Sequence, residues 1–179
     1  MIAAAVSLAL LTGLWPHHHA AKPEARPTFQ RAKLEGWTYE IWTDGFTGTK
    51  TCKLYGRDRK SGVRMTYVSG AVVFHLGHGL DPQTAVYRID GGPPHASRDD
   101  EAPLAQHRVV MPNPVLNQSD QGLVFVPDQA IAGAKEVAFR PGPKARLKTV
   151  SLAGLEAALA AAEARGCRPE AFAQLEVPE

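Results

Sequence analysis

The sequence predicts a mainly β protein, an antiparallel sandwich or barrel of about eight strands with one C-terminal α-helix. Three observations lead to this fold class. Glycine (16 residues) and proline (14 residues) are plentiful and interrupt the chain at short intervals. Between them, short segments alternate apolar and polar residues, which is the period of a strand with one buried face. A single segment near the C-terminus instead repeats its apolar residues at helical spacing.

The first expected strand is "WTYEIWTD" (37–44), in which Trp37, Tyr39 and Ile41 share one face. The apolar run "AVVFHL" (71–76) is expected to be buried on both faces. Polar and proline-rich stretches such as "SRDDEAP" (97–103) are expected to form solvated loops. The remaining expected strands cover 48–56, 63–68, 85–89, 107–111, 122–127, 135–140 and 146–150.

The helix is expected over "LAGLEAALAAAEAR" (152–165), with Ser151 as its N-terminal cap. Leu152, Leu155, Leu159 and Ala162 would form its apolar stripe. Gly166 occupies the position where a left-handed residue ends a helix, and a proline soon follows at 169.

The N-terminal segment Ile2–Trp15 contains no charged residue. It is too short to span a bilayer, which needs about 20 apolar residues, and it fits the apolar region of a secretory signal peptide. We therefore expect a signal peptide over 1–21, a flexible leader over 22–35 and a single β-rich domain over 36–179. An uncleaved N-terminal anchor is the alternative interpretation of the same apolar segment.

The chain has two cysteines, Cys52 in an expected strand and Cys167 just after the expected helix. In an oxidising compartment an even number of cysteines is more often paired than free. The sequence therefore predicts a Cys52–Cys167 disulfide that fastens the C-terminal helix to the sheet. Two unrelated buried thiols are the alternative, and a catalytic dithiol is disfavoured because no C-x-x-C motif occurs.

Two clusters contain residue types that carry out chemistry. "FHLGHGLD" offers His75, His78 and Asp81, which could hold zinc or copper, although they could equally be exposed loop residues. The second cluster is the loop "DGGPPHASRDDE". Because acid–base catalysis needs groups held together in a cleft, this proline-rich loop is interpreted as a solvated contact loop. Its candidate contact residues are Asp90, His95, Asp99, Asp100 and Glu101.

Charge excludes little, because the net charge is only +2. Basic residues form two interrupted groups with few aromatic residues among them, a pattern that disfavours nucleic-acid binding but allows weak contact with an anionic membrane surface. No phosphate-binding glycine motif and no nucleophile elbow is present, so no cofactor is expected. The two groups are Arg57, Arg59, Lys60 and Arg64, and Arg140, Lys144, Arg146 and Lys148.

The segments "LGHGLDPQTAVYRIDGGP", "GLVFVP" and "VSLAGLEAAL" occur in this order along the chain. In this respect the sequence resembles the invasion-associated locus B family of bacterial secreted or periplasmic proteins, over roughly 37–166. The resemblance implies a β-rich, sandwich-like fold and an export signal. It supplies no catalytic residue.

These observations together predict an exported periplasmic or envelope-associated protein that binds an envelope protein or ligand and has no catalytic activity. The alternative is a periplasmic metal-assisted hydrolase that uses His75, His78 and Asp81. A purely structural envelope protein is a third interpretation.

Overall fold

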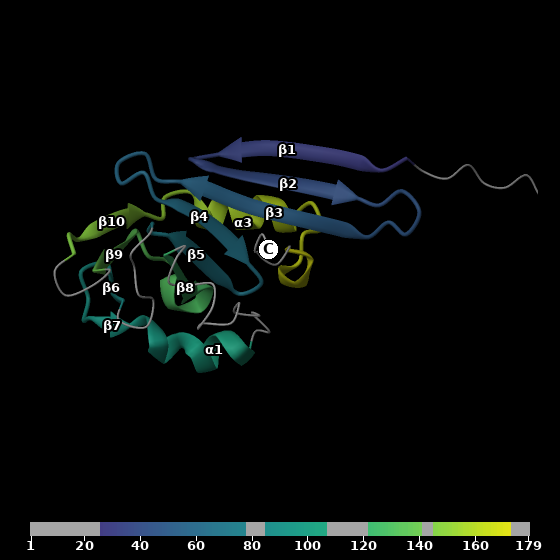
Figure 1. Cartoon of the computed structure of the whole chain (residues 1–179). Helices are drawn as coiled ribbons and strands as arrows, with labels where there is room; N and C mark the ends of the chain where they lie inside the picture. The colour runs from purple at the N-terminus through teal and green to yellow at the C-terminus, as the bar shows by residue number, and fades with distance from the viewer. Residues whose placement is uncertain (1–25, 78–84, 107–121, 141–144, 173–179) are drawn as a thin grey trace, which may run out of the picture.

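The computed structural model describes residues 26–77, 85–106, 122–140 and 145–172, and it contains two antiparallel sheets (Figure 1). The larger sheet has the strand order β1-β2-β3-β4-β5-β8, and the smaller sheet has the order β10-β9-β6-β7. The predicted mainly β class is confirmed. The described strands form two separate sheets that share one core, and neither sheet closes into a barrel. Of the two predicted architectures, the fold is therefore the sandwich.

The larger sheet consists of β1 (Thr28–Leu34), β2 (Trp37–Thr43), β3 (Lys50–Arg57), β4 (Arg64–Val68), β5 (Ala71–His75) and β8 (Leu123–Pro127). The smaller sheet consists of β6 (Val86–Ile89), β7 (His95–Ala96), β9 (Glu136–Arg140) and β10 (Lys148–Ser151). The helical segments are η1 (Ser97–Asp100), α1 (Glu101–Gln106), η2 (Asp128–Ile131), α3 (Leu155–Glu163) and η3 (Pro169–Ala171).

The core lies between the two sheets. The expected inward residues of β2, Trp37, Tyr39 and Ile41, are all buried there. Phe74 from β5 meets Phe139 from β9 with their ring centroids 4.7 Å apart, which joins the two sheets through an aromatic pair. Alternation along the strands therefore reports the buried face correctly.

Strand β5 is buried on both faces, as its uninterrupted apolar sequence predicted. It lies between β4 and β8, and its second face belongs to a smaller apolar cluster that includes Leu104 of α1. The prediction of a solvated loop over 97–103 is therefore wrong, because these residues form η1 and the start of α1. Leu104, which follows this acidic stretch, packs against the outer face of the larger sheet.

The expectation of a flexible leader over 22–35 is wrong for Thr28–Leu34, which form β1. This strand pairs with β2 along its whole length, from Thr28 opposite Thr43 to Leu34 opposite Trp37. It is an edge strand held mainly by backbone hydrogen bonds, and most of its side chains are exposed. Its apolar residues Phe29, Ala32 and Leu34 therefore do not form the buried, alternating face that marked the other strands. The expected signal peptide over 1–21 and the expected strand over 107–111 lie outside the described residues.

The C-terminal helix is confirmed, but it begins at Leu155 rather than at 152. Its N-cap is Gly154, which has a left-handed φ of 80°, whereas Ser151 ends β10 and accepts a hydrogen bond from the backbone N–H of Ala153. The tight turn between β10 and α3 requires this glycine, because a Cβ there would meet Glu35 at 2.4 Å. The predicted left-handed Gly166 after the helix is confirmed, with a φ of 86°.

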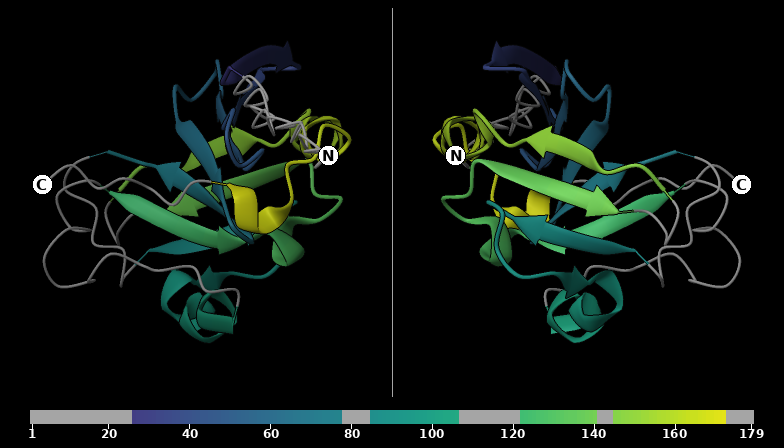
Figure 2. Two further views of the ribbon diagram at one scale, coloured as in Figure 1. Left: turned by 90° about the vertical axis from the view of Figure 1, so that its right-hand side faces the viewer. Right: turned by 90° about the vertical axis from the view of Figure 1, so that its left-hand side faces the viewer.

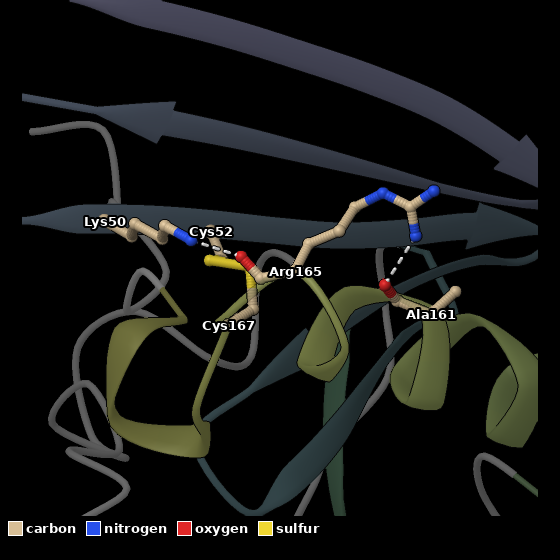
Figure 3. The surroundings of a disulfide bond; sticks show 5 residues. All are labelled: Lys50, Cys52, Ala161, Arg165 and Cys167. Atoms are coloured by element: carbon tan, nitrogen blue, oxygen red, sulfur yellow. Dashed lines mark hydrogen bonds between the residues drawn. A yellow bond between two sulfur atoms is a disulfide. The ribbon is translucent and has the colours of Figure 1, made fainter.

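The predicted disulfide is confirmed: Cys52 and Cys167 are bonded, with an S–S distance of 2.01 Å (Figure 3). Two cationic side chains support the same junction. The Lys50 ammonium donates a hydrogen bond to the backbone carbonyl of Arg165, and the Arg165 guanidinium lies 5.3 Å from the centre of the Tyr39 ring. The end of α3 is therefore fastened to the inner side of β2 and β3 by one covalent bond and two polar contacts.

Candidate functional site

The two faces of the larger sheet have different surroundings. The inner face is covered by the smaller sheet and α3, and the outer face of β4, β5 and β8 is covered by η1 and α1. Figures 1 and 2 show α1 at the opposite end of the molecule from β1. Among the described elements, none packs on the outer side of β1–β3. We call this surface the open face, and its residues are Phe29, Arg31, Lys33, Thr38, Glu40, Trp42, Thr51, Lys53, Tyr55 and Arg57.

The open face is basic. Four of its residues are cations, namely Arg31, Lys33, Lys53 and Arg57, against the single carboxylate of Glu40. Strand register extends this charge onto β4, because Arg57 pairs with Arg64. Cross-strand neighbours of like charge repel each other, so the arrangement favours an anion that bridges them.

The one carboxylate of the open face is already neutralised. Arg31 Nε lies 3.3 Å from Oε1 of Glu40, and the Tyr55 hydroxyl donates to the same oxygen at 2.7 Å. Arg31 also donates to the Tyr55 hydroxyl oxygen at 3.1 Å. Burial, followed by the bond to Glu40, raises the pKa of Tyr55, so its hydroxyl remains a donor at neutral pH. The cations other than Arg31 therefore face solvent without this counter-charge.

Aromatic rings gather at one end of the open face. The ring centroids of Phe29 and Trp42 lie 5.1 Å apart, and the Phe29 side chain is 55% exposed. The Lys53 ammonium lies 5.4 Å from the centre of the Trp42 ring. This end therefore offers apolar surface and positive charge to the same ligand.

A cleft of about 390 Å³ lies at the ends of β2 and β3 away from these rings, where the inward-facing Trp37 and Met65 and the connection from β10 to α3 line it. Arg57 lines this cleft and also belongs to the open face, and its Nε donates to the carbonyl of Gly62. Although burial acts to raise the pKa of Asp58, hydrogen bonds from Ser61 and nearby backbone N–H groups bring it below its ordinary value. The cleft is lined by Glu35, Gly36, Trp37, Arg57, Asp58, Arg59, Met65, Ser151 and Ala153.

The three predicted metal ligands are only partly described. His75 ends β5 on the outer side of the sheet, where its Nε2 lies 3.3 Å from Oγ1 of Thr66. Burial, followed by the nearby Arg64, lowers the pKa of His75. His78 and Asp81 lie outside the described residues. In the described part of the chain, no three His, Cys, Asp or Glu side chains are close enough to hold a metal, so the metal site stays a prediction.

The predicted contact loop is divided between structural and exposed residues. Asp90 has a left-handed φ of 46°, and its carboxylate accepts hydrogen bonds from the backbone N–H groups of Lys135 and Glu136, both at 2.9 Å. It therefore joins β6 to β9. Asp99 is exposed, and its Oδ1 lies 3.8 Å from Nε of Arg98. Glu101 is exposed in the first turn of α1.

The buried side chains of Asp100 and Tyr87 form a hydrogen-bonded network with the exposed side chain of His95. The Tyr87 hydroxyl donates to Asp100 at 2.9 Å, and Nε2 of His95 lies 2.9 Å from the other carboxylate oxygen. Asp100 is only 4% exposed, and burial raises its pKa although both partners act in the opposite direction. Burial, followed by the Asp100 charge, also raises the pKa of Tyr87. The network holds η1 against the smaller sheet, a role that the sequence did not indicate.

The open face could have been found from the sequence by its period. In "TFQRAKL" (28–34), strict alternation places Phe29, Arg31 and Lys33 on one side of a strand. The second basic group is less informative. Lys144 lies outside the described residues, and the Lys148 ammonium donates to the carbonyl of Leu76.

Comparisons with known proteins return no match: no family model, no curated protein and no solved structure matches this chain. The structure itself defines the class: this is a protein of two antiparallel sheets with one disulfide and an open face that is basic and aromatic. The disulfide is typical of an oxidising compartment outside the cytoplasm. Among the helices in the described residues, none has the length and apolar character needed to cross a membrane.

Proposed function

We propose that this chain is an exported, envelope-associated binding protein without catalytic activity, and that the open face binds an anionic ligand. The observation that carries the proposal is the charge of this face, four cations against one carboxylate that Arg31 and Tyr55 already engage. The disulfide supports the compartment, and the resemblance to the exported invasion-associated locus B family supports the same assignment.

The physics favours an extended ligand over a single small ion. Two unit charges about 4 Å apart gain only about 1 kcal/mol in water, so one exposed cation binds an anion weakly. An array of cations engages several charges of one ligand at once, and this binding weakens as salt screens it. Phe29 and Trp42 add apolar contact at one end of the array.

The test uses a soluble polyanion, dextran sulfate, with uncharged dextran as the reference ligand. We expect the full chain to bind the sulfated polymer only, with an affinity that falls steeply between about 0.05 M and about 0.5 M salt. The variant Lys33→Gln/Lys53→Gln should lose about tenfold in affinity, because it removes two charges that face the ligand.

The matched control is Arg88→Gln/Arg140→Gln, which removes two charges from the exposed side of the smaller sheet. It should bind as the wild type does. An equal loss in both variants, measured by isothermal titration calorimetry, would show that the net charge of the chain and not the open face governs binding. Equal binding of both polymers would also contradict the proposal.

A further inference from the structure

The hairpin between β2 and β3 presents an exposed phenylalanine on a tip with several internal hydrogen bonds. Phe46 is 80% exposed, and its backbone N–H donates to the Asp44 carboxylate at 2.9 Å. The same carboxylate accepts hydrogen bonds from the backbone N–H and the hydroxyl of Thr47. Gly48 adds a backbone bond to the Asp44 carbonyl and has a left-handed φ of 72°. The tip is therefore shaped by its own hydrogen bonds, and Phe46 is not needed to hold it.

Two more aromatic rings lie at this end of the molecule. Phe29 pairs with Trp42 one residue before the end of β2, on the open face and next to the hairpin. The described residues leave three large apolar side chains exposed, namely Phe29, Phe46 and Leu147. Two of the three therefore lie at the hairpin end, and exposed apolar side chains gathered in this way indicate a contact surface.

The cations of the open face lie directly behind these rings. Lys53 stands over Trp42, and Arg31 and Lys33 follow along β1, each pointing to the same side as Phe29. Aromatic rings at a tip, followed by lysine and arginine, match the layers of an anionic bilayer surface, in which apolar acyl chains lie beneath charged headgroups. The Asp44 carboxylate opposes this charge, but its bonds turn it toward the hairpin backbone.

If the apolar N-terminal segment is retained as an anchor, the course of the chain places this same end near a membrane. Thr28 pairs with Thr43, so the first residue of β1 lies beside the hairpin (Figure 1). The apolar segment Ile2–Trp15 precedes Thr28 by a stretch, 16–27, that spans at most about 40 Å when extended. A chain whose apolar segment has entered a bilayer therefore holds the hairpin end within reach of the headgroups.

Resting on the proposed function above, we propose that the ligand of the open face is the anionic headgroup surface of a phospholipid bilayer. The domain docks on this surface hairpin-first. Phe46, Phe29 and Trp42 enter the interface, and Arg31, Lys33 and Lys53 pair with headgroup phosphates.

The test measures Trp42, because the apolar N-terminal segment could bind vesicles without the hairpin. The full chain and its Trp42→Phe variant are mixed with vesicles of phosphatidylcholine with brominated acyl chains that also contain about 30% unbrominated phosphatidylglycerol, so that the quencher remains when phosphatidylglycerol is left out. The difference between their tryptophan emissions reports Trp42 alone, because both proteins contain the other two tryptophans. We expect the bromine to quench this Trp42 signal by at least half, and to have little effect in about 0.5 M salt or without phosphatidylglycerol.

The role of the hairpin is tested with Phe46→Ser, which is introduced both into the full chain and into its Trp42→Phe variant. The matched control is Leu147→Ser, introduced into the same two proteins, because Leu147 is also exposed. Phe46→Ser should reduce the quenching of Trp42 at least threefold, and Leu147→Ser should leave it unchanged. Unquenched Trp42 in a protein that still binds dextran sulfate would overturn the bilayer proposal and leave the proposed function intact. A Trp42 signal that responds to alginate, a soluble polyuronate, but not to vesicles would identify an acidic glycan as the ligand and also overturn the bilayer proposal.

Discussion

Removing the Cys52–Cys167 disulfide should have the largest effect on stability of any change considered for this chain. The bond joins residues 115 positions apart. On the chain-entropy model, a closed loop of this length stabilises the folded state by about 5 kcal/mol, because it restricts the unfolded chain. Domains of this size are stable by about 5–15 kcal/mol in total, so the loss is a large fraction of the whole.

The contacts of α3 decide how much structure survives without the bond. Leu155, Ala158 and Ala162 remain buried in the core, and the Trp37 ring N–H donates to the carbonyl of Ala153 at 3.1 Å. These contacts hold the helix along its length as far as Ala162, but they do not hold the segment that follows Glu163. We therefore expect the Cys52→Ala/Cys167→Ala variant to fold, with the segment after Glu163 detached first.

The assay is urea unfolding followed by tryptophan fluorescence, on the oxidised wild type, the reduced wild type and the double variant. Both perturbed proteins should lose about 4–5 kcal/mol in the free energy of unfolding, and the slope m should rise because the open unfolded chain exposes more surface. Lys50→Met is the control, because it removes the contact with the Arg165 carbonyl, keeps the disulfide and should cost about 1 kcal/mol. A loss below about 2 kcal/mol in both perturbed proteins would refute the entropic reasoning.

Three further predictions concern single side chains. Burial and Arg64 lower the pKa of His75, so the unfolded state takes up the proton more readily, and stability should fall as the pH drops below about 6.5. His75→Gln should remove this fall in urea titrations between about pH 7 and 5. Burial raises the pKa of Asp100, so the stability that its protonated form contributes is present below about pH 4 and is lost as the pH rises through the folded pKa. Asp100→Asn should therefore gain stability relative to the wild type as the pH rises, and a constant difference in urea titrations would contradict this sign. Asp90→Ala should lower the free energy of unfolding by about 2 kcal/mol, because it removes the acceptor of two backbone N–H groups and places alanine at a left-handed φ, whereas Asp90→Asn should cost about half as much in the same assay.

Local patterns predicted most of the strands, because a strand with one buried face imposes its period on the sequence. Residues 71–76 were predicted to be buried on both faces, and the structure confirms this for β5. The disulfide was predicted from the number of cysteines and the apolar leader, and it is also confirmed. In each case the composition of the chain or a property of a short segment was sufficient.

Segments with a single anchor could not be recognised in this way. Leu104 and Asp100 are the buried side chains that hold η1 and α1 to the sheets, and the charged residues around them suggested a loop. Strand β1 is held mainly by backbone pairing with β2, and it has no fully buried apolar face of the kind that predicted the other strands. The start of α3 depends on Gly154, because the space at this position beside Glu35 is too small for a Cβ. Glu35 is far from Gly154 in the sequence, so the sequence pattern around the helix did not show this restriction.

By itself, the sequence determined the class of the fold, the partners of the disulfide and the buried side of most strands, because each depends on composition or on a local period. Only the tertiary structure decided which charges meet. The register of three strands places Arg31, Tyr55 and Glu40 in one network and leaves Lys33 and Lys53 facing solvent beside Trp42. Charge neutralisation depends on distances of a few ångströms between separate strands, and a linear pattern does not contain those distances.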